Sequence, residues 1–125
     1  MIPKELKPSG LYDLIRIGKD NDGGYLVCKN SVYKSDVLIS FGISDDFSFE
    51  EQFQKLNNVK IFAYDPTTTN NFFLKQFLHN ILKLNFIQFF NKFNNYIKFK
   101  NFFKKKNNHF FLKKICKGGS ISYKH

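Results

Sequence analysis

Residues 37–53, VLISFGISDDFSFEEQF, contain the pattern that decides the fold class of this chain. A mainly apolar run of strand length covers residues 36–41 and ends at Gly42. Such runs are typical of strands that are buried on both faces, as in a parallel sheet flanked by helices. The stretch therefore predicts an α/β fold with a buried strand before the glycine.

A helix is expected after the loop that follows Gly42. Ser48 and Glu51 have the S-x-x-E spacing of a capping box, in which each side chain satisfies a free backbone amide at the start of a helix. Phe49, Phe53 and Leu56 recur at steps of four and three residues, which places them on one face of that helix.

A second strand is expected at residues 59–64, VKIFAY, and Asp65 and Pro66 end it. The order is strand, glycine-containing loop, helix and strand. This is a βαβ unit, which calls for a right-handed parallel crossover.

Upstream of this unit, residues 14–18 and 24–28 both have strand composition, and the turn-forming segment KDNDG lies between them. We therefore expect a hairpin or a tight strand reversal. Gly23 and Gly24 can take positive φ or allow a close approach of two backbone segments.

From residue 70 onward the pattern becomes helical, and one long helix or two shorter ones are expected up to residue 103. The tail beyond contains a Lys run, a Gly-Gly turn and the composition of a strand start at residues 120–123. Lys and Asn surround a stripe at three- and four-residue steps, formed by Leu78, Leu82, Phe86, Phe89, Phe93, Tyr96 and Lys100.

Charge is distributed unevenly along the 125 residues, whose formal net charge is +10. Residues 1–66 contain all 10 acidic residues, whereas residues 67–125 contain 12 Lys and no acid. Lys, Phe, Asn and Ile have codons made only of A and T. The excess of Lys in residues 67–125 therefore has two competing explanations, an AT-rich genome and a functional basic surface.

The cysteines and histidines indicate no metal site. Cys28 and Cys116 lie far apart and belong to no zinc or redox spacing, so two reduced thiols are expected. The histidines have no metal-ligand spacing with each other or with Cys116. Neither a signal peptide nor a membrane-spanning run is recognisable, and a cytoplasmic location is the default expectation.

The loop after the first strand of the βαβ unit favours a particular ligand class. It lies where open α/β sheets bind ligands, and Asp65 at the next strand tip stands where such folds bind ribose hydroxyls. Asp45 and Asp46 would repel a pyrophosphate, but they are compatible with the amino and sulfonium groups of S-adenosylmethionine. That comparison favours S-adenosylmethionine over NAD.

The motifs RIGKDNDGGYLV, LISFGISDDFSFEEQF and IFAYDPT, in this order, resemble the N-terminal part of the FkbM-like branch of class I S-adenosylmethionine-dependent methyltransferases. The resemblance covers residues 14–67. It implies a partial Rossmann-like methyltransferase sheet, made of the hairpin and the βαβ unit, followed by basic amphipathic helices. It also implies methyl transfer from S-adenosylmethionine to a small-molecule, sugar or lipid acceptor.

The same resemblance implies roles for individual residues. The backbone of residues 41–43 would line the methionine part of the cofactor, and Asp65 would bind its ribose. Glu50 looks like the acid that ends the family's first motif. The implied cofactor-binding residues are Phe41, Gly42, Ile43, Glu50 and Asp65. No catalytic residue is identified, because in-line methyl transfer needs mainly positioning.

The chain departs from the family pattern at Ser44, where a second glycine is common, and in its length, which is short for such an enzyme. We therefore expect a truncated or split chain. Residues 1–66 would be the N-terminal half of the cofactor-binding domain, and residues 67–125 a basic helical segment of the same domain.

Structural roles compete with these assignments. Asp65 would be a strand-end acid that caps a turn. Asp45, Asp46 and Glu50 would be acids stabilised at a helix N-terminus.

The basic second half supports a rival function as a non-catalytic module that contacts an anionic membrane surface or nucleic acid. Nucleic acid is the less favoured partner, since no RNA-binding motif is present. Core packing combined with codon bias is the structural alternative, and the oligomeric state is not determined by the sequence.

Overall fold

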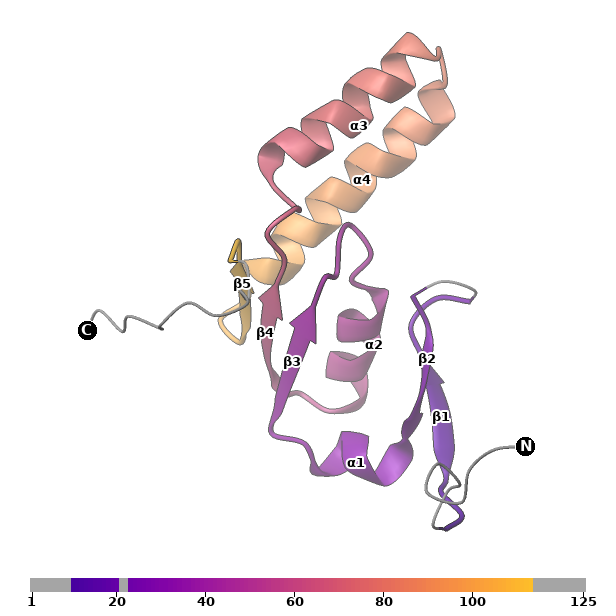
Figure 1. Cartoon of the computed structure of the whole chain (residues 1–125), viewed down its shortest axis with the longest axis vertical. Helices are drawn as coiled ribbons and strands as arrows, with labels where there is room; N and C mark the ends of the chain where they lie inside the picture. The colour runs from indigo at the N-terminus through magenta and orange to yellow at the C-terminus, as the bar shows by residue number, and fades with distance from the viewer. Residues whose placement is uncertain (1–9, 21–22, 114–125) are drawn as a thin grey trace, which may run out of the picture.

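The computed structural model describes residues 10–20 and 23–113, so Cys116 and the strand start expected at residues 120–123 lie outside the described residues. The fold is mixed α/β, with a two-stranded antiparallel hairpin and a parallel sheet in the order β3-β4-β5 (Figure 1). In chain order the elements are β1 (Leu14–Ile17), β2 (Tyr25–Cys28), α1 (Lys29–Lys34), β3 (Val37–Phe41), α2 (Ser48–Leu56), β4 (Lys60–Tyr64), α3 (Asn70–Leu82), α4 (Phe86–Phe103) and β5 (Asn108–Phe111).

The predicted βαβ unit is confirmed as β3, α2 and β4. The two strands are parallel, and their register runs from Val37 opposite Lys60 to Phe41 opposite Tyr64. The predicted hairpin is also confirmed, with β1 antiparallel to β2. Between these strands, Gly18 and Gly23 take φ angles of +96° and +94°, a conformation that glycine adopts readily.

Strand β5 corrects the interpretation of residues 67–125 as a basic helical segment, since no strand was expected at residues 108–111. Its residues pair in parallel with β4, from Ile61 opposite Asn108 to Tyr64 opposite Phe111. Four residues between lysine-rich segments are too few to produce a convincing two-residue periodicity. The strand is stabilised by its place beside β4, which a local pattern does not reveal.

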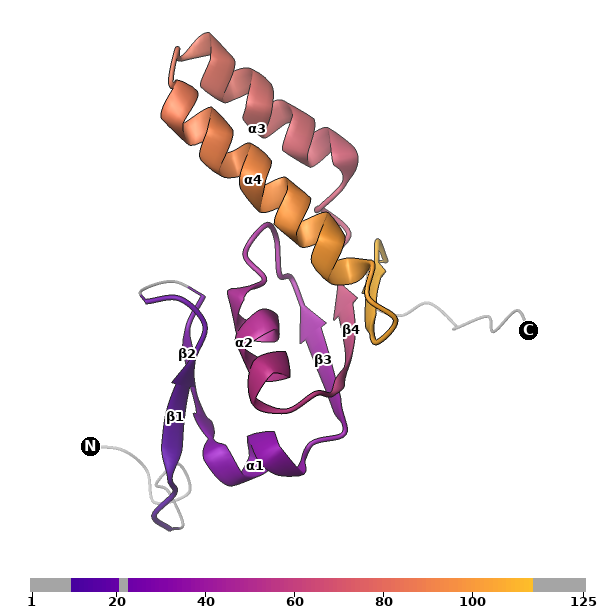
Figure 2. The same cartoon turned by 180° about the vertical axis from the view of Figure 1, so that it is seen from behind.

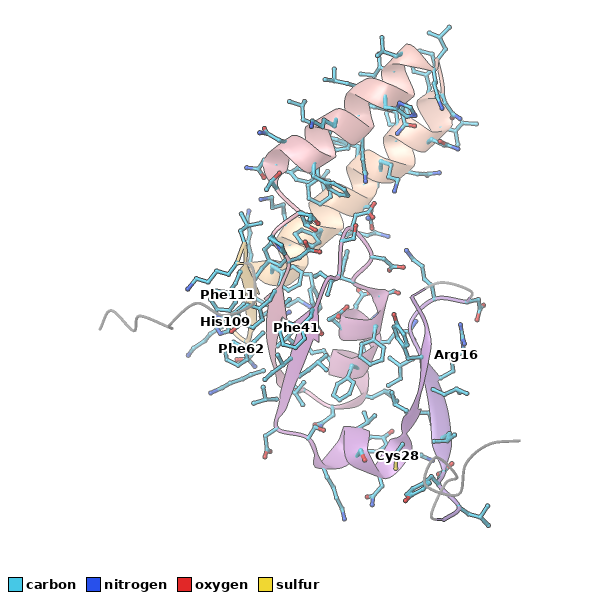
Figure 3. All side chains as sticks on the ribbon, viewed as in Figure 1. Arg16, Cys28, Phe41, Phe62, His109 and Phe111 are labelled. Carbon is cyan, nitrogen blue, oxygen red and sulfur yellow. The ribbon has the colours of Figure 1, made fainter. Side chains whose placement is uncertain are left out.

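The expectation that β3 is buried on both faces is wrong. Val37, Ile39 and Phe41 are 43%, 57% and 61% exposed, whereas the alternate residue Ser40 is buried. On the same exposed face, Phe62 stacks on His109 at a centroid distance of 5.1 Å (Figure 3). An apolar run indicates a strand, but whether a second layer covers it depends on distant parts of the structure.

The opposite face of the sheet carries the core. Buried side chains of β4 pack with those of α2 and of the C-terminal end of α4. Phe47, just before α2, contacts Phe99 and Phe102 at ring-centroid distances of 5.8 and 5.2 Å. The main buried side chains are Ile17, Val32, Ile43, Phe47, Phe53, Val59, Ile61, Ala63, Phe73, Phe99 and Phe102.

The predicted capping box at the start of α2 is wrong, although the helix itself is confirmed. Ser48 is the first helical residue, and the N-cap Phe47 has no side-chain capping bond. Asp46 caps the turn instead, because its Oδ1 accepts a hydrogen bond from the Ser48 amide at 3.1 Å. Of the expected buried face, Phe53 is buried but Leu56 is largely exposed.

Two helices, rather than one, occupy residues 70–103. Helices α3 and α4 lie side by side and extend away from the sheet, as both views show (Figures 1 and 2). Their contact is aromatic, with Phe77 of α3 at 5.9 Å from both Phe89 and Phe93 of α4. The predicted stripe is only partly buried, since Leu78 and Leu82 face solvent. Among the described residues, no helix has the length and apolarity needed to cross a membrane.

Candidate functional site

A cavity of about 480 Å³ opens at the carboxyl end of β3. Its walls are the end of β3, the loop 42–46, the first turn of α2 and the tip of the β1–β2 hairpin. This is the edge at which open α/β sheets bind ligands, and the volume is within the range of small-molecule sites.

Three polar contacts join the hairpin to α2 and to the loop that precedes it. The Gly18 amide donates to Gln52 Oε1 at 2.9 Å, and the Lys19 amide donates to Ser48 Oγ at 3.1 Å. The Lys19 ammonium group lies 3.1 Å from Asp46 Oδ1. Gly23 also fits closely, since a Cβ at this position would lie 2.6 Å from Asp46 Oδ2. The hairpin is therefore a fixed wall of the cavity.

The loop contains two residues with left-handed backbone conformation. Gly42 has φ +66°, and a Cβ added there would meet no atom within 4 Å. Ser44 has φ +51°, which is uncommon for a residue with a side chain. Glycine would adopt this conformation more readily than serine does. The Ser44 amide, turned by this geometry, donates to Asp65 Oδ2 at 2.8 Å.

Asp65 is 2% exposed and does not line the cavity. Its second carboxylate oxygen, Oδ1, accepts hydrogen bonds from the Thr67 amide and hydroxyl at 2.7 and 2.6 Å, and from the Thr68 amide at 3.3 Å. Burial raises the pKa of this carboxyl, but the hydrogen bonds from Thr67, Ser44 and Thr68 outweigh burial and lower its pKa. Asp65 thus acts as the turn-capping acid of the structural alternative, and ribose binding stays a prediction.

Glu50 lines the cavity from the first turn of α2 and is only 4% exposed. Within the described part of the chain, its Oε2 atom has no hydrogen-bond partner. Burial raises the pKa of this carboxyl, and a hydrogen bond with the Ser40 side chain opposes that rise. A buried polar atom without a partner is costly, so the atom is a candidate ligand contact.

The two loop acids are already neutralised by lysines. The Asp45 Oδ2 atom lies 2.6 Å from the Lys92 ammonium group of α4, and Asp46 forms an ion pair with Lys19. The negative charge of each acid is therefore balanced by a lysine. The Asn95 side-chain amide also donates to the Asp45 carbonyl at 2.7 Å. These ion pairs reduce the repulsion that Asp45 and Asp46 would exert on a pyrophosphate, compared with what the sequence suggests.

Four of the five predicted cofactor-binding residues meet at this cavity, namely Phe41, Gly42, Ile43 and Glu50. Sequence reasoning missed Tyr25 of the hairpin, which lines the cavity, and Lys92 and Asn95 of α4, which bond to Asp45 in the loop. The excess of Lys was the only signal for Lys92, and it did not distinguish one lysine from another.

Within residues 10–20 and 23–113, no cluster of three or more His, Cys, Asp or Glu side chains has the arrangement of a metal site. Compared with known protein families, curated proteins and solved structures, the chain gives no match.

Proposed function

We propose that the cavity at the carboxyl end of β3 binds S-adenosylmethionine and that the protein is a methyltransferase of the FkbM-like type. The observation that carries this proposal is the buried, unpartnered Oε2 atom of Glu50 at the cavity wall. A cationic group of the ligand, such as the amino group of the methionine part, would supply the partner that this carboxylate lacks.

The fit to the rest of the ligand is supported by the loop. Gly42 leaves open space above its backbone, so a ligand can approach the chain closely there. The strand order β3-β4-β5 is that of one half of a doubly wound sheet, which supports a Rossmann-like fold. The proposal includes a cytoplasmic location, where such a cofactor is available.

S-adenosylmethionine would supply the methyl group for transfer to a small-molecule, sugar or lipid acceptor. The protein's own contribution is positioning, because the hairpin and α2 hold the cavity walls in a fixed relation. Asp65 would contribute indirectly by holding the Ser44 amide and hence the loop, in addition to its predicted contact with ribose.

Calorimetric titration with S-adenosylhomocysteine tests the proposal. We expect Glu50→Gln to weaken binding about tenfold or more, since a charge-assisted contact is lost. Glu51→Gln is the matched control, because Glu51 lies in the same helical turn but forms a solvent-exposed pair with Lys55. Equal affinities of the wild type and the Glu50 variant would contradict the proposal.

The ribose assignment needs its own measurement. A ribose contact is ruled out if the Asp65→Asn variant remains folded and binds S-adenosylhomocysteine as tightly as the wild type. This outcome would leave the proposed role of Glu50 unchanged.

A further inference from the structure

One end of the α3–α4 hairpin points away from the sheet (Figures 1 and 2). This end carries exposed apolar side chains. We call the surface that they form the tip face. Leu82 and Ile87 are 83% and 78% exposed, and the other members are at least 45% exposed. Contiguous exposed apolar surface of this kind marks an interaction site on a folded protein. The helical members are Leu78, Ile81, Leu82, Phe86, Ile87 and Phe90.

The contributions of the two helices fall on the same side of the hairpin. Phe77 and Phe89 contact each other across the helix pair at 5.9 Å. Leu78 and Phe90 each follow one of these residues, so each is rotated by about 100° about its helix axis. Because the helices are antiparallel, rotations in this sense bring both side chains to one face. The two apolar stripes therefore form one surface.

The opposite side of the hairpin faces the rest of the protein. Lys92 and Asn95 precede the contact residues Phe93 and Tyr96 by one position, and both bond to Asp45 in the loop 42–46. The tip face thus points away from the loop and from the candidate cofactor site.

The turn between α3 and α4 places an exposed leucine, Leu84, in a left-handed backbone conformation that is unfavourable for a residue with a side chain. The Asn85 amide donates to the Asn80 carbonyl at 3.0 Å, and the Leu84 amide donates to the Ile81 carbonyl at 2.9 Å. This is the Schellman pattern, whose left-handed position is usually glycine. Here that position is Leu84, with φ +52° and 75% exposure. A large apolar side chain occupies the position where glycine would be more stable.

The charge around the tip face has one sign. Residues 67–125 contain no acid. Lys83 is the C-cap of α3, between Leu82 and Leu84, and Lys75 lies about two turns earlier on the same helix. Neither lysine forms a salt bridge with a described residue. These lysines are exposed, and their long chains allow the ammonium groups to reach beyond an apolar surface.

We propose that the tip face inserts into the surface of a bilayer that contains anionic lipids. Such a surface supplies both an apolar layer for Leu84 and Ile87 and negative charge for the lysines. A second copy of the chain would oppose lysines to lysines. Nucleic acid would favour aromatic stacking residues, whereas the most exposed members are aliphatic. The proposal does not depend on the cofactor site.

Co-sedimentation of the full chain with vesicles tests this inference. We expect binding to vesicles of phosphatidylcholine with phosphatidylserine, weakened by salt, and little binding to phosphatidylcholine alone. Leu84→Gly should reduce binding about tenfold, since an inserted side chain is lost, without reducing thermal stability. Lys83→Gln should reduce the salt dependence.

Ile87→Ser and Ile39→Ser form a matched pair, because both remove an exposed isoleucine but only the first belongs to the tip face. We expect only Ile87→Ser to lose vesicle binding, and this variant should bind S-adenosylhomocysteine as the wild type does, since Ile87 lies outside the cavity. The inference is overturned if vesicles are not bound, if both variants lose binding equally, or if neither loses it. It is also overturned if the tip-face substitutions instead abolish a dimer or a tighter complex with an oligonucleotide.

Discussion

Two buried carboxyl groups beside the loop 42–46 have pKa values shifted in opposite directions. Glu50 lacks a partner for one oxygen, so burial dominates and its pKa is raised. Asp65 is also buried, but hydrogen bonds outweigh burial and its pKa is lowered. The difference separates a residue available to a ligand from one committed to the fold.

Glu50→Gln should stabilise the protein at neutral pH and weaken the binding of the cofactor. A carboxyl with a raised pKa favours folding while it is protonated, and this contribution is lost as pH rises from its ordinary value of 4.5 through the folded value. The glutamine variant has no such loss. Urea unfolding across pH should show its stability advantage growing as pH rises, and a difference independent of pH would contradict the assignment.

Asp65→Asn should have the opposite pH dependence. A lowered pKa stabilises the folded state above the ordinary value of 3.8, and this contribution is lost as pH falls through the folded value. We expect the variant to lose about 2 kcal/mol of unfolding free energy at neutral pH, because charge-assisted hydrogen bonds are removed. The deficit relative to the wild type should shrink in acid, as followed by chemical denaturation.

Gly42→Ala and Gly18→Ala should separate backbone strain from steric overlap. Both positions have positive φ, but a Cβ at Gly42 meets open space, whereas one at Gly18 lies 2.1 Å from the Gly23 carbonyl oxygen. We expect Gly42→Ala to cost about 1 kcal/mol and Gly18→Ala to cost considerably more. Thermal unfolding of the two variants measures the difference, and equal losses would argue against the close approach in the hairpin turn.

At the scale of elements, α1 depends on its neighbours. It has six residues, too few for a helix that is stable alone. The Asn57 side chain donates to the Val32 and Ser35 carbonyls at 2.8 and 2.7 Å, and thereby ties the end of α1 to the end of α2. The Val32 carbonyl also accepts a long hydrogen bond, at 3.4 Å, from the backbone amide of the C-cap residue Ser35.

Asn57→Ala should therefore cost about 2 kcal/mol, because two hydrogen bonds to partly buried carbonyls are lost. Hydrogen exchange should show loss of protection concentrated in α1. Asn58→Ala is the control, since the Asn58 side chain forms no hydrogen bond with another described residue. Equal effects of the two substitutions would show that α1 does not depend on this contact.

At the scale of the whole molecule, the described sheet is covered on one side only. Ile61→Ala, at a fully buried position, should cost about 3 kcal/mol, since a cavity forms in the core. Ile39→Ala, on the open face, should change stability by about 0.5 kcal/mol or less. Denaturant unfolding compares the two, and a large loss for Ile39→Ala would show that this face is covered in solution.

Local patterns were sufficient for several elements. Adjacent glycines marked the hairpin turn, and the run before Gly42 followed by periodic aromatics marked β3 and α2. These signals depend on backbone dihedrals and side-chain periodicity, which neighbouring residues set. These patterns did not single out Phe41, Gly42, Ile43 and Glu50, which were chosen by the resemblance to a methyltransferase motif, and all four line the cavity.

The sequence by itself determined the order of strand, glycine loop, helix and strand, the helical character of residues 70–103, and the separation of acidic and basic halves. Only the tertiary structure decided that β5 joins the sheet, that one face stays open, and that Asp45 and Asp46 are paired while Glu50 is not. The physical reason is that burial and partners come from segments distant in the chain. The type of a residue determines which hydrogen bonds and ion pairs it is able to form. The fold determines which of these partners are within reach.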